Sequence, residues 1–499
     1  MPIKLGPILR FRGSDNNRWK VSALLVSENE ANAPIVRYGV ANDEAMPVNI
    51  GSREFDTASR WQITRHDMEI VMTDTDQKIS YTVNGMTYSF TVPAIDSLPR
   101  CGYASCNGFS DPKLMKKVTD QNERWSDLNT RHGTNAYHLL LMGGDQVYSD
   151  SMWDELPSLR SWSESDERFG LPFTESMQRE VGDYYYQLYV KRWAQAKVSQ
   201  ALASIPTLMM WDDHDIFDGW GSYPEKQQVS DVYQNIFRQA KECFSLFQLH
   251  NSNYGLLPEQ NAYNGFFEAG KLGILVLDLR SERTQDQVIS GKSWDAIYQR
   301  LESIPENRLD HLFVMSSIPV VHADFNTLES LLGIIPGQQE LEDDLRDHWL
   351  SRPHRGERIR LIRRLLDFAK EKNCRVTLLS GDVHLAALGT IESGQHDTGG
   401  NAHVINQLTS SGIVHPSPNA TALFFLNQVA GCVETVDRDI HAQLIEFPTT
   451  RYCFIGARNW LALESDPKDN DQRRYWANWH VEGEKYPFTK VIHAADLPE

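Results

Sequence analysis

The stretch SIPTLMMWDDHDIFDGW, residues 204–220, joins a short apolar run to a dense group of acids. Residues 205–210 have the length and composition typical of a buried strand. Four aspartates and one histidine follow almost together: Asp212, Asp213, His214, Asp215 and Asp218. Carboxylates this close repel one another and lose hydration where a fold buries them. The acids therefore either lie in solvent or are neutralised by a strongly positive partner.

Three other apolar runs end in polar residues of the kind that bind metals. The runs are CGYASCNG (101–108), LLLMGG (139–144) and VTLLSG (376–381). The polar residues at their ends are Cys106 and Asn107, Asp145 and Tyr148, and Asp382 and His384. The glycine before each of the two aspartates lets the backbone turn sharply at that point.

The order of the segments indicates a layered α/β protein. From about residue 98, short apolar runs alternate with longer amphipathic segments, as in buried strands covered by helices. Residues 1–97 show period-two and β-branched segments with a hairpin signal at Asn84-Gly85, and predict a small β-sandwich-like domain. We expect the α/β domain over residues 98–455, and a C-terminal extension, packed over it, over residues 456–499.

Composition narrows the classes of partner. The formal net charge of −18 argues against general nucleic-acid binding and against adhesion to anionic membranes. No run of residues approaches the length of a membrane span, and the N-terminus lacks the apolar core of a signal peptide. We therefore expect a cytoplasmic protein, although a leader removed earlier would leave no trace. The oligomeric state is left open by the sequence.

The strand-end residues, taken together, predict a metal centre. Taken singly, each has a simpler interpretation: Asp145 as a helix cap, Tyr148 as a packed aromatic, Cys106 as a small buried residue, and the acidic run as a solvated loop. Ligands of layered α/β domains sit at the carboxyl ends of strands, where these residues converge if the runs are neighbouring strands. Thiolate, phenolate, carboxylate and imidazole groups at one sheet edge are metal ligands, and two cations would hold this many anions.

Four motifs in this order, ASCN, GGDQVY, WDDHD and SGDVH, resemble the alkaline phosphatase D (PhoD-like) family of the calcineurin-like metallophosphoesterases. The resemblance covers about residues 98–430, and LDLRSER at 277–283 is also similar to that family. It implies a four-layer αββα sandwich with the metals at the strand ends, preceded here by the small all-β domain. It also implies an enzyme that hydrolyses small-molecule phosphoesters, as a phosphodiesterase and phosphomonoesterase.

The resemblance implies two metals that share a carboxylate. The positions that hold Fe³⁺ in the family match four residues of this sequence: Cys106, Asp145, Tyr148 and His384. Asp145 would bridge to the second metal, whose further ligands match Asp213 and Asp382. This second site contains only oxygen ligands and suits Ca²⁺ best, with Mn²⁺, Mg²⁺ or Zn²⁺ as alternatives.

The catalytic roles also follow from the resemblance. A metal-bound hydroxide would attack phosphorus while His214 acts as the general acid, and Asp215 would orient the imidazole of His214. Asn107 would contact the phosphoryl oxygens or the metal-bound water. Arg280 is a candidate for substrate binding, whereas Arg283 is expected to fix the acid-rich loop.

Two parts of the interpretation stay open. The isolated histidine that the superfamily carries on a later strand has no clear counterpart, and His415 either approaches the site or only packs. A phosphotriesterase is an alternative within the enzymes. A metal-stabilised scaffold without catalysis is the alternative outside them, and the presence of His214 beside Asp213 argues against it because a scaffold needs no general acid.

Overall fold

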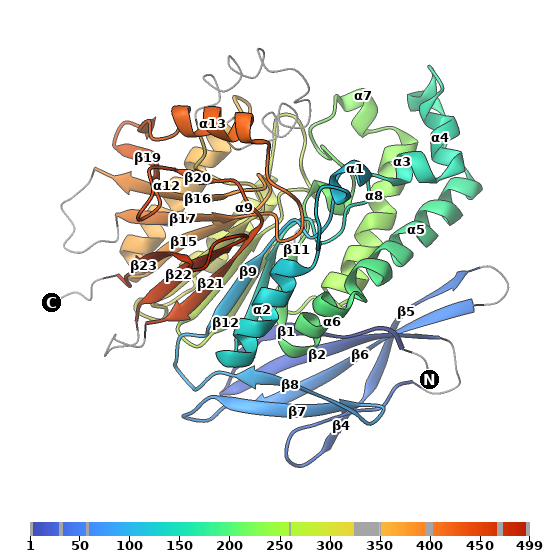
Figure 1. Cartoon of the computed structure of the whole chain (residues 1–499), viewed down its shortest axis with the longest axis horizontal. Coiled ribbons are helices and arrows are strands. Elements are labelled where there is room, and N and C mark those ends of the chain that lie inside the picture. Colours follow the sequence, from blue (N-terminus) through green and yellow to red (C-terminus); the bar gives the residue numbers. More distant parts are fainter. Residues whose placement is uncertain are drawn as a thin grey trace.

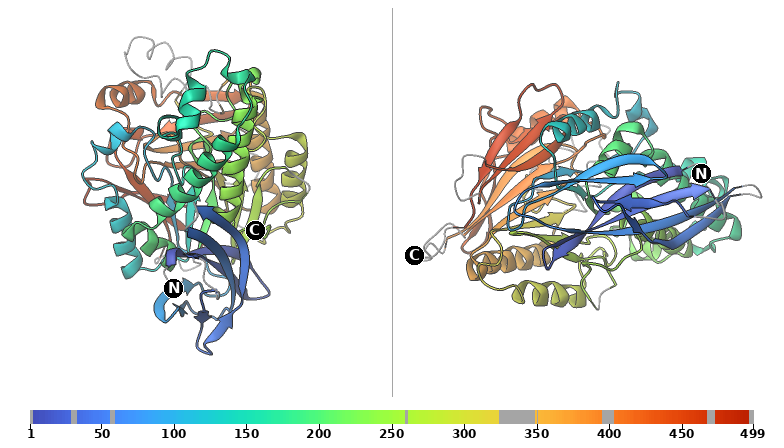
Figure 2. Two further views of the ribbon diagram at one scale, coloured as in Figure 1. Left: turned by 90° about the vertical axis from the view of Figure 1, so that its right-hand side faces the viewer. Right: turned by 90° about the horizontal axis from the view of Figure 1, so that it is seen from below.

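The protein is described by a computed structural model that covers residues 3–28, 33–55, 59–258, 261–323, 349, 351–394, 403–466 and 473–495. Two large β-sheets lie face to face, with helices over their outer faces (Figure 1). A smaller sheet lies with the N-terminal strands at one end of the molecule (Figure 2). The predicted αββα fold with an additional β-rich unit is confirmed.

The first large sheet has the order β23-β22-β21-β9-β10-β11-β1-β2-β6-β5 among the described residues. In that order the strands are Phe488–Ile492, Tyr475–Val481, Asn459–Ser465, Cys101–Ala104, Leu139–Gly143, Thr207–Met210, Ile3–Asp15, Arg18–Glu28, Ser59–Val71 and Pro47–Phe55. Strands β9, β10 and β11 are parallel neighbours. Their carboxyl ends therefore meet at one edge of the sheet.

The second large sheet has the order β12-β13-β14-β15-β17-β16-β19-β18, and β20 pairs with β16. In the order β12 to β18 and then β20, the strands are Gly265–Ala269, Leu272–Leu277, His311–Ser316, Arg375–Ser380, Val404–Ser410, Ala386–Ser393, Ile440–Ile445, Glu434–Asp437 and Phe454–Ile455. Strands β13, β14, β15 and β17 are parallel. The loop that follows β15 therefore lies at the edge of the sheet where the parallel strands end.

The N-terminal residues contribute to two sheets. Strands β4 (Asp43–Ala45), β3 (Val36–Tyr38), β7 (Gln77–Val83) and β8 (Met86–Val92) form a four-stranded sheet. The predicted hairpin is present, because Asn84 and Gly85 join β7 to β8 with φ of +49° and +86°. Strands β1, β2, β5 and β6 instead belong to the ten-stranded sheet, where β1 pairs with β11. On the other side of the central strands, the C-terminal strand β21 pairs with β9. The sheet is thus continuous across residues 97 and 456, and the division into domains there stays a prediction.

Helices cover the outer face of each large sheet. Over the first sheet lie α2 (Glu123–Thr134), α5 (Glu175–Trp193), α6 (Ala196–Ser204) and α8 (Asp231–Cys243), which runs into the π-helical turn η4 (Phe244–Gln248). Over the second lie α9 (Gly291–Glu302) and α12 (Arg355–Lys372). The other helical segments are α1 (Pro112–Met115), α3 (Met152–Glu155), α4 (Pro157–Ser163), η2 (Arg168–Gly170), η3 (Asp213–Asp215), α7 (Glu225–Gln228) and α13 (Ala420–Val429).

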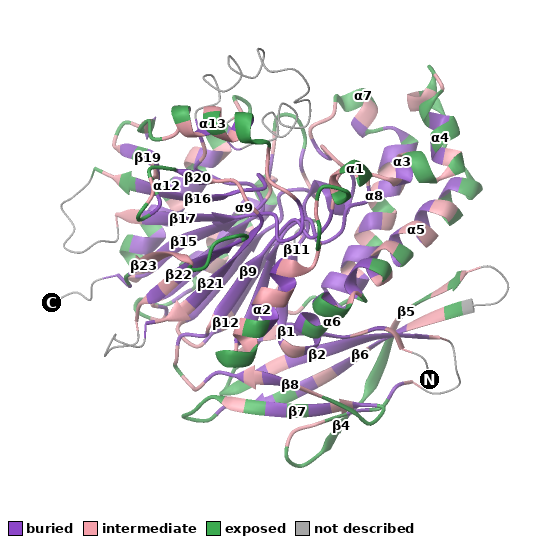
Figure 3. Ribbon diagram, in the orientation of Figure 1, coloured by how far each residue is buried: buried purple, intermediate pink, exposed green. Residues whose placement is uncertain are grey.

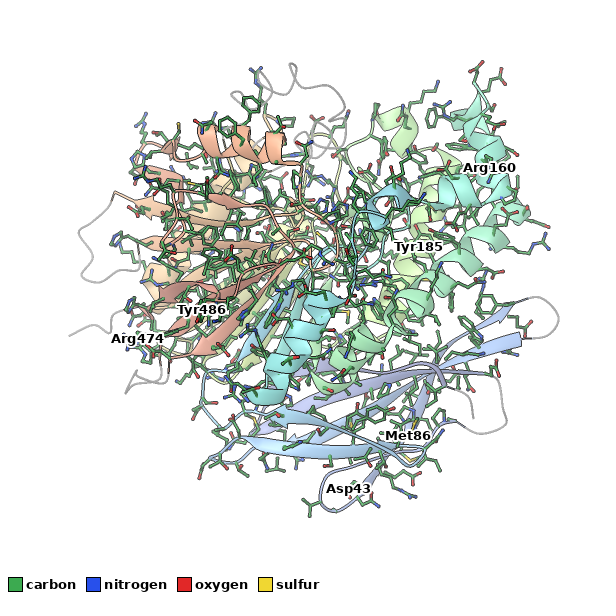
Figure 4. The ribbon with its side chains drawn as sticks, in the orientation of Figure 1. Asp43, Met86, Arg160, Tyr185, Arg474 and Tyr486 are labelled. Carbon is green, nitrogen blue, oxygen red and sulfur yellow. The ribbon has the colours of Figure 1, made fainter. Side chains whose placement is uncertain are left out.

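Three buried clusters hold these layers together. In β10, Leu140 and Met142 pack toward the helices, while Leu139 and Leu141 pack into the space between the sheets, so every residue of this parallel strand is buried. The central strands are accordingly buried along their length, whereas much of β4 and β5 is exposed (Figure 3). Side chains fill the layers: Tyr185 lies on the helical side, and Met86 and Asp43 lie in the four-stranded sheet (Figure 4).

Candidate metal centre

The strand ends predicted to carry chemistry meet at one edge of the two sheets. Cys106 follows β9, Asp145 follows β10 and Asp213 follows β11, while Asp382 and His384 follow β15 of the second sheet. Backbone hydrogen bonds join the first two loops: Cys106 N donates to Gly144 O (3.2 Å) and Asn107 N donates to Asp145 O (2.8 Å). The site is thus built from loops whose positions the parallel strands fix.

Left-handed backbone conformations concentrate in these loops. The φ angles are +54° at Cys106, +52° at Asp145, +68° at Asp382 and +53° at His384. Each such conformation costs a residue with a side chain about 1–3 kcal/mol, and it persists only where the surroundings impose it. Gly144, with φ of +106°, precedes Asp145 and would tolerate no ordinary side chain without strain. These conformations therefore reduce the stability of the fold, and strain of this kind is typical of functional sites.

The first group of possible ligands contains a thiol, a carboxylate and an imidazole. Atoms of Cys106, Asp145 and His384 that could bind a metal lie within 4.8 Å of one another. The Sγ of Cys106 lies 3.4 Å from Oδ2 of Asp145, and the hydroxyl of Tyr148 lies 3.3 Å from Nε2 of His384. The structure thus brings together all four residues that the sequence assigns to the first metal.

The second group consists of carboxylates. Oxygen atoms of Asp145, Asp212, Asp213 and Asp382 lie within 4.8 Å of one another, so Asp145 belongs to both groups. The buried oxygens Oδ1 of Asp145 and Oδ2 of Asp212 accept no hydrogen bond from the described residues. Buried polar atoms are normally satisfied. Unsatisfied carboxylate oxygens that converge in this way fit bound cations.

Electrostatics agree with a cation site. Burial raises the pKa of Asp145 well above its ordinary value, and it raises the pKa of Asp212 to about 7 although Arg280 opposes the shift. Burial likewise raises the pKa values of the Cys106 thiol and the Tyr148 hydroxyl. Without a cation, burial therefore disfavours the charged forms of these groups. A bound cation would reverse this and favour the deprotonated forms that act as ligands.

Two neutral histidines stack beside the first group. Burial lowers the pKa of His384 well below its ordinary value and that of His415 to about 3. Their rings are 3.5 Å apart with an angle of 19° between their planes. Nδ1 of His415 lies 2.9 Å from the Pro416 carbonyl, and its Nε2 lies 3.0 Å from Ser110 Oγ. His415 therefore approaches the site as a support for the His384 ring, with both of its nitrogens engaged by the protein.

The predicted orienting residue of His214 is wrong. The carboxylate that contacts His214 is Asp150, whose Oδ2 lies 2.7 Å from Nδ1 of the imidazole. Asp215 instead accepts hydrogen bonds from the backbone N–H groups of Gln146 and Asp212, because the short helix η3 turns its side chain back toward its own N-terminus. Burial raises the pKa of Asp215 to about 7.

The charge on His214 is set by its carboxylate neighbours. Burial by itself would lower the pKa of His214, but Asp150 and Asp213 outweigh it and hold the pKa well above the ordinary value. The ring of Tyr148 stacks on the imidazole at 4.4 Å. Atoms of Asp213, His214 and Asp218 also form a third group that could hold a metal. His214 is therefore a buried, protonated imidazole at the border of the acidic cluster.

Arg280 and Asn107, which were predicted to contact the substrate, are both held by protein groups. Arg280 is 1% exposed and pairs through Nε with Asp212 and through Nη2 with Asp213, so it fixes the acid-rich loop. The side-chain oxygen of Asn107 accepts hydrogen bonds from Trp125 and Arg192. These contacts make both residues part of the framework, because their polar atoms are directed at protein groups. Nη2 of Arg283 lies 3.3 Å from Nδ1 of His354, and its methylene groups lie against Gly221, just after the acidic run.

Sequence reasoning did not find Asp150 and Asp212 as site residues. Asp212 was visible as part of the acidic run, and like Asp213 it pairs with Arg280 through its Oδ1. Asp150 stands two residues after Tyr148, and this proximity to a strand end was the available signal.

A sandwich of two sheets with acidic residues at the strand ends defines a metallophosphoesterase-like α/β protein. The chain belongs to the PhoD related phosphatase family, which it matches over residues 72–339 and 328–433. It is 29% identical over 474 residues to the uncharacterized protein YGR266W of Saccharomyces cerevisiae, an alignment that covers 79% of this chain and 67% of the yeast protein.

A solved structure titled "Structure of PhoD" has the same fold. It superposes with a TM-score of 0.57 and 12% sequence identity, and the match covers 97% of this chain and 88% of that one. Among the residues that the structure describes, none of the helices is both long and apolar enough to cross a membrane.

Proposed function

We propose that the protein is a metal-dependent phosphoester hydrolase that accepts phosphodiesters and phosphomonoesters. The observation that carries the proposal is the pair of ligand groups that share Asp145, together with the buried carboxylate oxygens that accept no hydrogen bond. Membership of a phosphatase family supports the same reaction class. A cytoplasmic location stays a prediction from the sequence.

The donor atoms suggest which cations would bind. Cys106, Tyr148 and His384 with Asp145 offer sulfur, phenol, imidazole and carboxylate, a set that suits Fe³⁺ once the thiol and phenol are deprotonated. Asp145, Asp213 and Asp382 offer only oxygen, which suits Ca²⁺, Mg²⁺ or Mn²⁺ better than Zn²⁺. Two cations held by these residues would polarise the phosphoryl group of a bound ester and lower the pKa of water.

His214 is proposed to protonate the leaving group. Asp150 holds Nδ1 of the imidazole, which leaves Nε2 as the nitrogen that can donate a proton. The carboxylates around the ring keep it protonated at neutral pH. Stacking on Tyr148 and the contact with Asp150 restrict the ring to one orientation. These features match a general acid, whose proton must lie close to the departing oxygen.

The charge of the substrate supports the need for cations. The chain carries a net charge of −18, and Arg280 at the acid-rich loop is already paired with Asp212 and Asp213. An anionic phosphoester would therefore be repelled by the protein unless bound metal supplied positive charge. We infer that the protein needs bound metal to bind its substrate as well as to hydrolyse it.

The test is an assay of purified protein with 4-nitrophenyl phosphate and bis(4-nitrophenyl) phosphate, with added Ca²⁺ or Mn²⁺. A 4-nitrophenyl phosphotriester serves as a third substrate and separates the triesterase alternative. We expect turnover of the first two substrates, and its loss after chelation. A preparation that contains its metals and hydrolyses none of the three would overturn the proposal and leave a metal-stabilised scaffold.

A further inference from the structure

A second group of charged side chains lies on the N-terminal half of the first sheet. Arg10 and Arg12 stand two residues apart on β1 and so point to the same face. In the register of the sheet, Arg10 is opposite Ser22 of β2, and Ser22 is opposite Asp67 of β6. Arg65, two residues before Asp67, completes the group from the same strand. Three arginines thus surround one aspartate on one sheet face.

The loop after η4 covers this face. His250 is fully buried, and its Nδ1 lies 2.8 Å from the hydroxyl of Ser22. Arg65 donates from Nη1 to the carbonyl oxygens of His250 (3.1 Å) and Asn251 (3.3 Å). His250 and Asn251 both have positive φ, +51° and +48°. The surrounding structure therefore imposes this loop conformation over the arginines.

The charges in this group do not balance. Asp67 pairs with Nη1 of Arg12 at 3.0 Å and with Nε of Arg65 at 3.0 Å. Arg10 is 1% exposed, and its polar contact is made by Nη2 with the carbonyl of Tyr254 at 3.4 Å. One carboxylate thus faces three guanidinium groups, while the nearby Lys20 is paired with Asp15. A buried guanidinium without a counter-charge is unfavourable.

Donor atoms in the group are also unused. Nη1 of Arg10, Nε of Arg12 and Nε2 of His250 are buried and have no hydrogen-bond partner among the described residues. Burial, and then the neighbouring Arg12 and Arg65, lower the pKa of Arg10 to about 9. Burial, and then Arg10, Arg65 and Arg12, lower the pKa of His250 well below its ordinary value, so its neutral ring can donate from one nitrogen only. An anion with several acceptor oxygens would satisfy these donors.

We propose that Arg10, Arg12, Arg65 and His250 form a binding site for a tetrahedral oxyanion, either inorganic phosphate or the phosphate group of a larger molecule. Three guanidinium groups against one carboxylate leave the charge that such an anion neutralises, and the unused donors match its oxygens. The side chains of Arg12 and Arg65 are each 16% exposed, so the group reaches solvent at these two residues.

The site is separate from the metal centre but connected to it. Gln248, the last residue of η4, donates from Nε2 to Asp215 Oδ1 at 2.9 Å, and His250 follows two residues later. Asp215 belongs to the same short helix as Asp213. This hydrogen bond thus joins the segment that covers the arginines to the loop that carries the acids of the metal centre.

Isothermal titration with inorganic phosphate tests the site, with chloride at matched ionic strength as the blank. Phenylphosphonate forms a second arm: tighter binding of phosphate identifies the free ion, whereas tighter binding of the phosphonate identifies a phosphate group on a larger ligand. Asp145→Asn, which alters the metal centre, should retain the binding. Arg12→Gln should weaken it about 10- to 150-fold, since one charge-assisted contact is lost.

Controls separate binding from general charge effects. Arg18→Gln removes an arginine of the same sheet whose side chain is 50% exposed, and it should leave the affinity unchanged. Arg10→Met keeps the volume but removes the buried charge. In phosphate-free buffer its Tm should equal or exceed that of the wild type, and phosphate should raise the Tm of the wild type but not of the variant. Equal responses of Arg12→Gln, Arg10→Met and wild type to phosphate, or binding that disappears in Asp145→Asn, would overturn the proposal.

Discussion

Replacement of Asp150 by asparagine tests whether this residue positions the general acid. Oδ2 of Asp150 lies 2.7 Å from Nδ1 of His214, and Oδ1 accepts the backbone N–H of Asp218 at 2.8 Å. Asparagine retains the shape of the side chain and one acceptor oxygen, but it lacks the charge. The imidazole then loses the partner that fixes its orientation and keeps it protonated.

The size of the effect follows from the contact that is lost. A hydrogen bond between charged groups contributes about 1.5–3 kcal/mol, and each 1.36 kcal/mol changes a rate tenfold. We therefore expect kcat for bis(4-nitrophenyl) phosphate to fall about 10- to 150-fold. KM should change little, because Asp150 is not among the residues that would hold substrate or metal. The measurement is steady-state kinetics of the two proteins at equal metal content.

Two variants separate positioning from general damage. Asp150→Glu keeps the charge and should recover part of the lost kcat. Asp215→Asn replaces a carboxylate oxygen that accepts backbone N–H groups beside His214. It should lower the Tm because the amide NH₂ of asparagine would face those N–H donors. An unchanged kcat in Asp150→Asn, or a loss of bound metal that accounts for the whole effect, would refute the positioning role.

Three further predictions address the site and the stability of the fold. His214→Ala should lower kcat about 10²–10⁴-fold without changing the metal content measured by elemental analysis; emptied sites would make His214 a ligand. Thiolate or phenolate bound to Fe³⁺ should colour the protein, and Tyr148→Phe should shift or remove the visible band; a colourless protein that contains only zinc would contradict the iron site. Burial lowers the pKa of His311 to about 4, so the unfolded chain binds a proton first as the pH falls from about 6.5. The free energy of unfolding should therefore decrease between about pH 6.5 and 4, by up to about 3 kcal/mol from this residue, and His311→Gln should show a smaller decrease in urea unfolding. Equal pH dependence in the two proteins would contradict this account.

The apolar runs predicted a layered α/β fold because the pattern of parallel strands is local, and the four-layer αββα arrangement was implied by the resemblance to the PhoD-like family. A fully apolar run such as residues 139–142 has nowhere to lie except between two layers, and a polar residue directly after it must lie at the sheet edge. The convergence of Cys106, Asp145 and His384 follows from that rule.

Other features depend on long-range pairing that no local pattern contains. The alternating residues of β1 and β2 suit a separate sandwich and an extension of the large sheet equally well. The parallel pairing of Arg10 with Thr207 decides between the two.

The orienting residue of His214 was mispredicted for a similar reason. Asp215 is adjacent to His214 in the sequence, but a capping interaction within η3 turns its carboxylate toward the backbone of Asp212. Asp150 reaches the imidazole because the loop after β10 crosses to the loop after β11, where Ser149 N donates to the carbonyl of His214 at 3.0 Å. Proximity in sequence indicated the wrong carboxylate, since the side-chain direction depends on turn geometry.

The metal content of the purified wild-type protein and of Asp145→Asn tests whether two cations share the carboxylate of Asp145. If the acids after Trp211 are held together by cations, the wild type contains two metal ions per chain, and one substitution at the shared carboxylate lowers the occupancy of both. A wild-type protein with one metal ion or none, or a variant that keeps both, would contradict the shared centre.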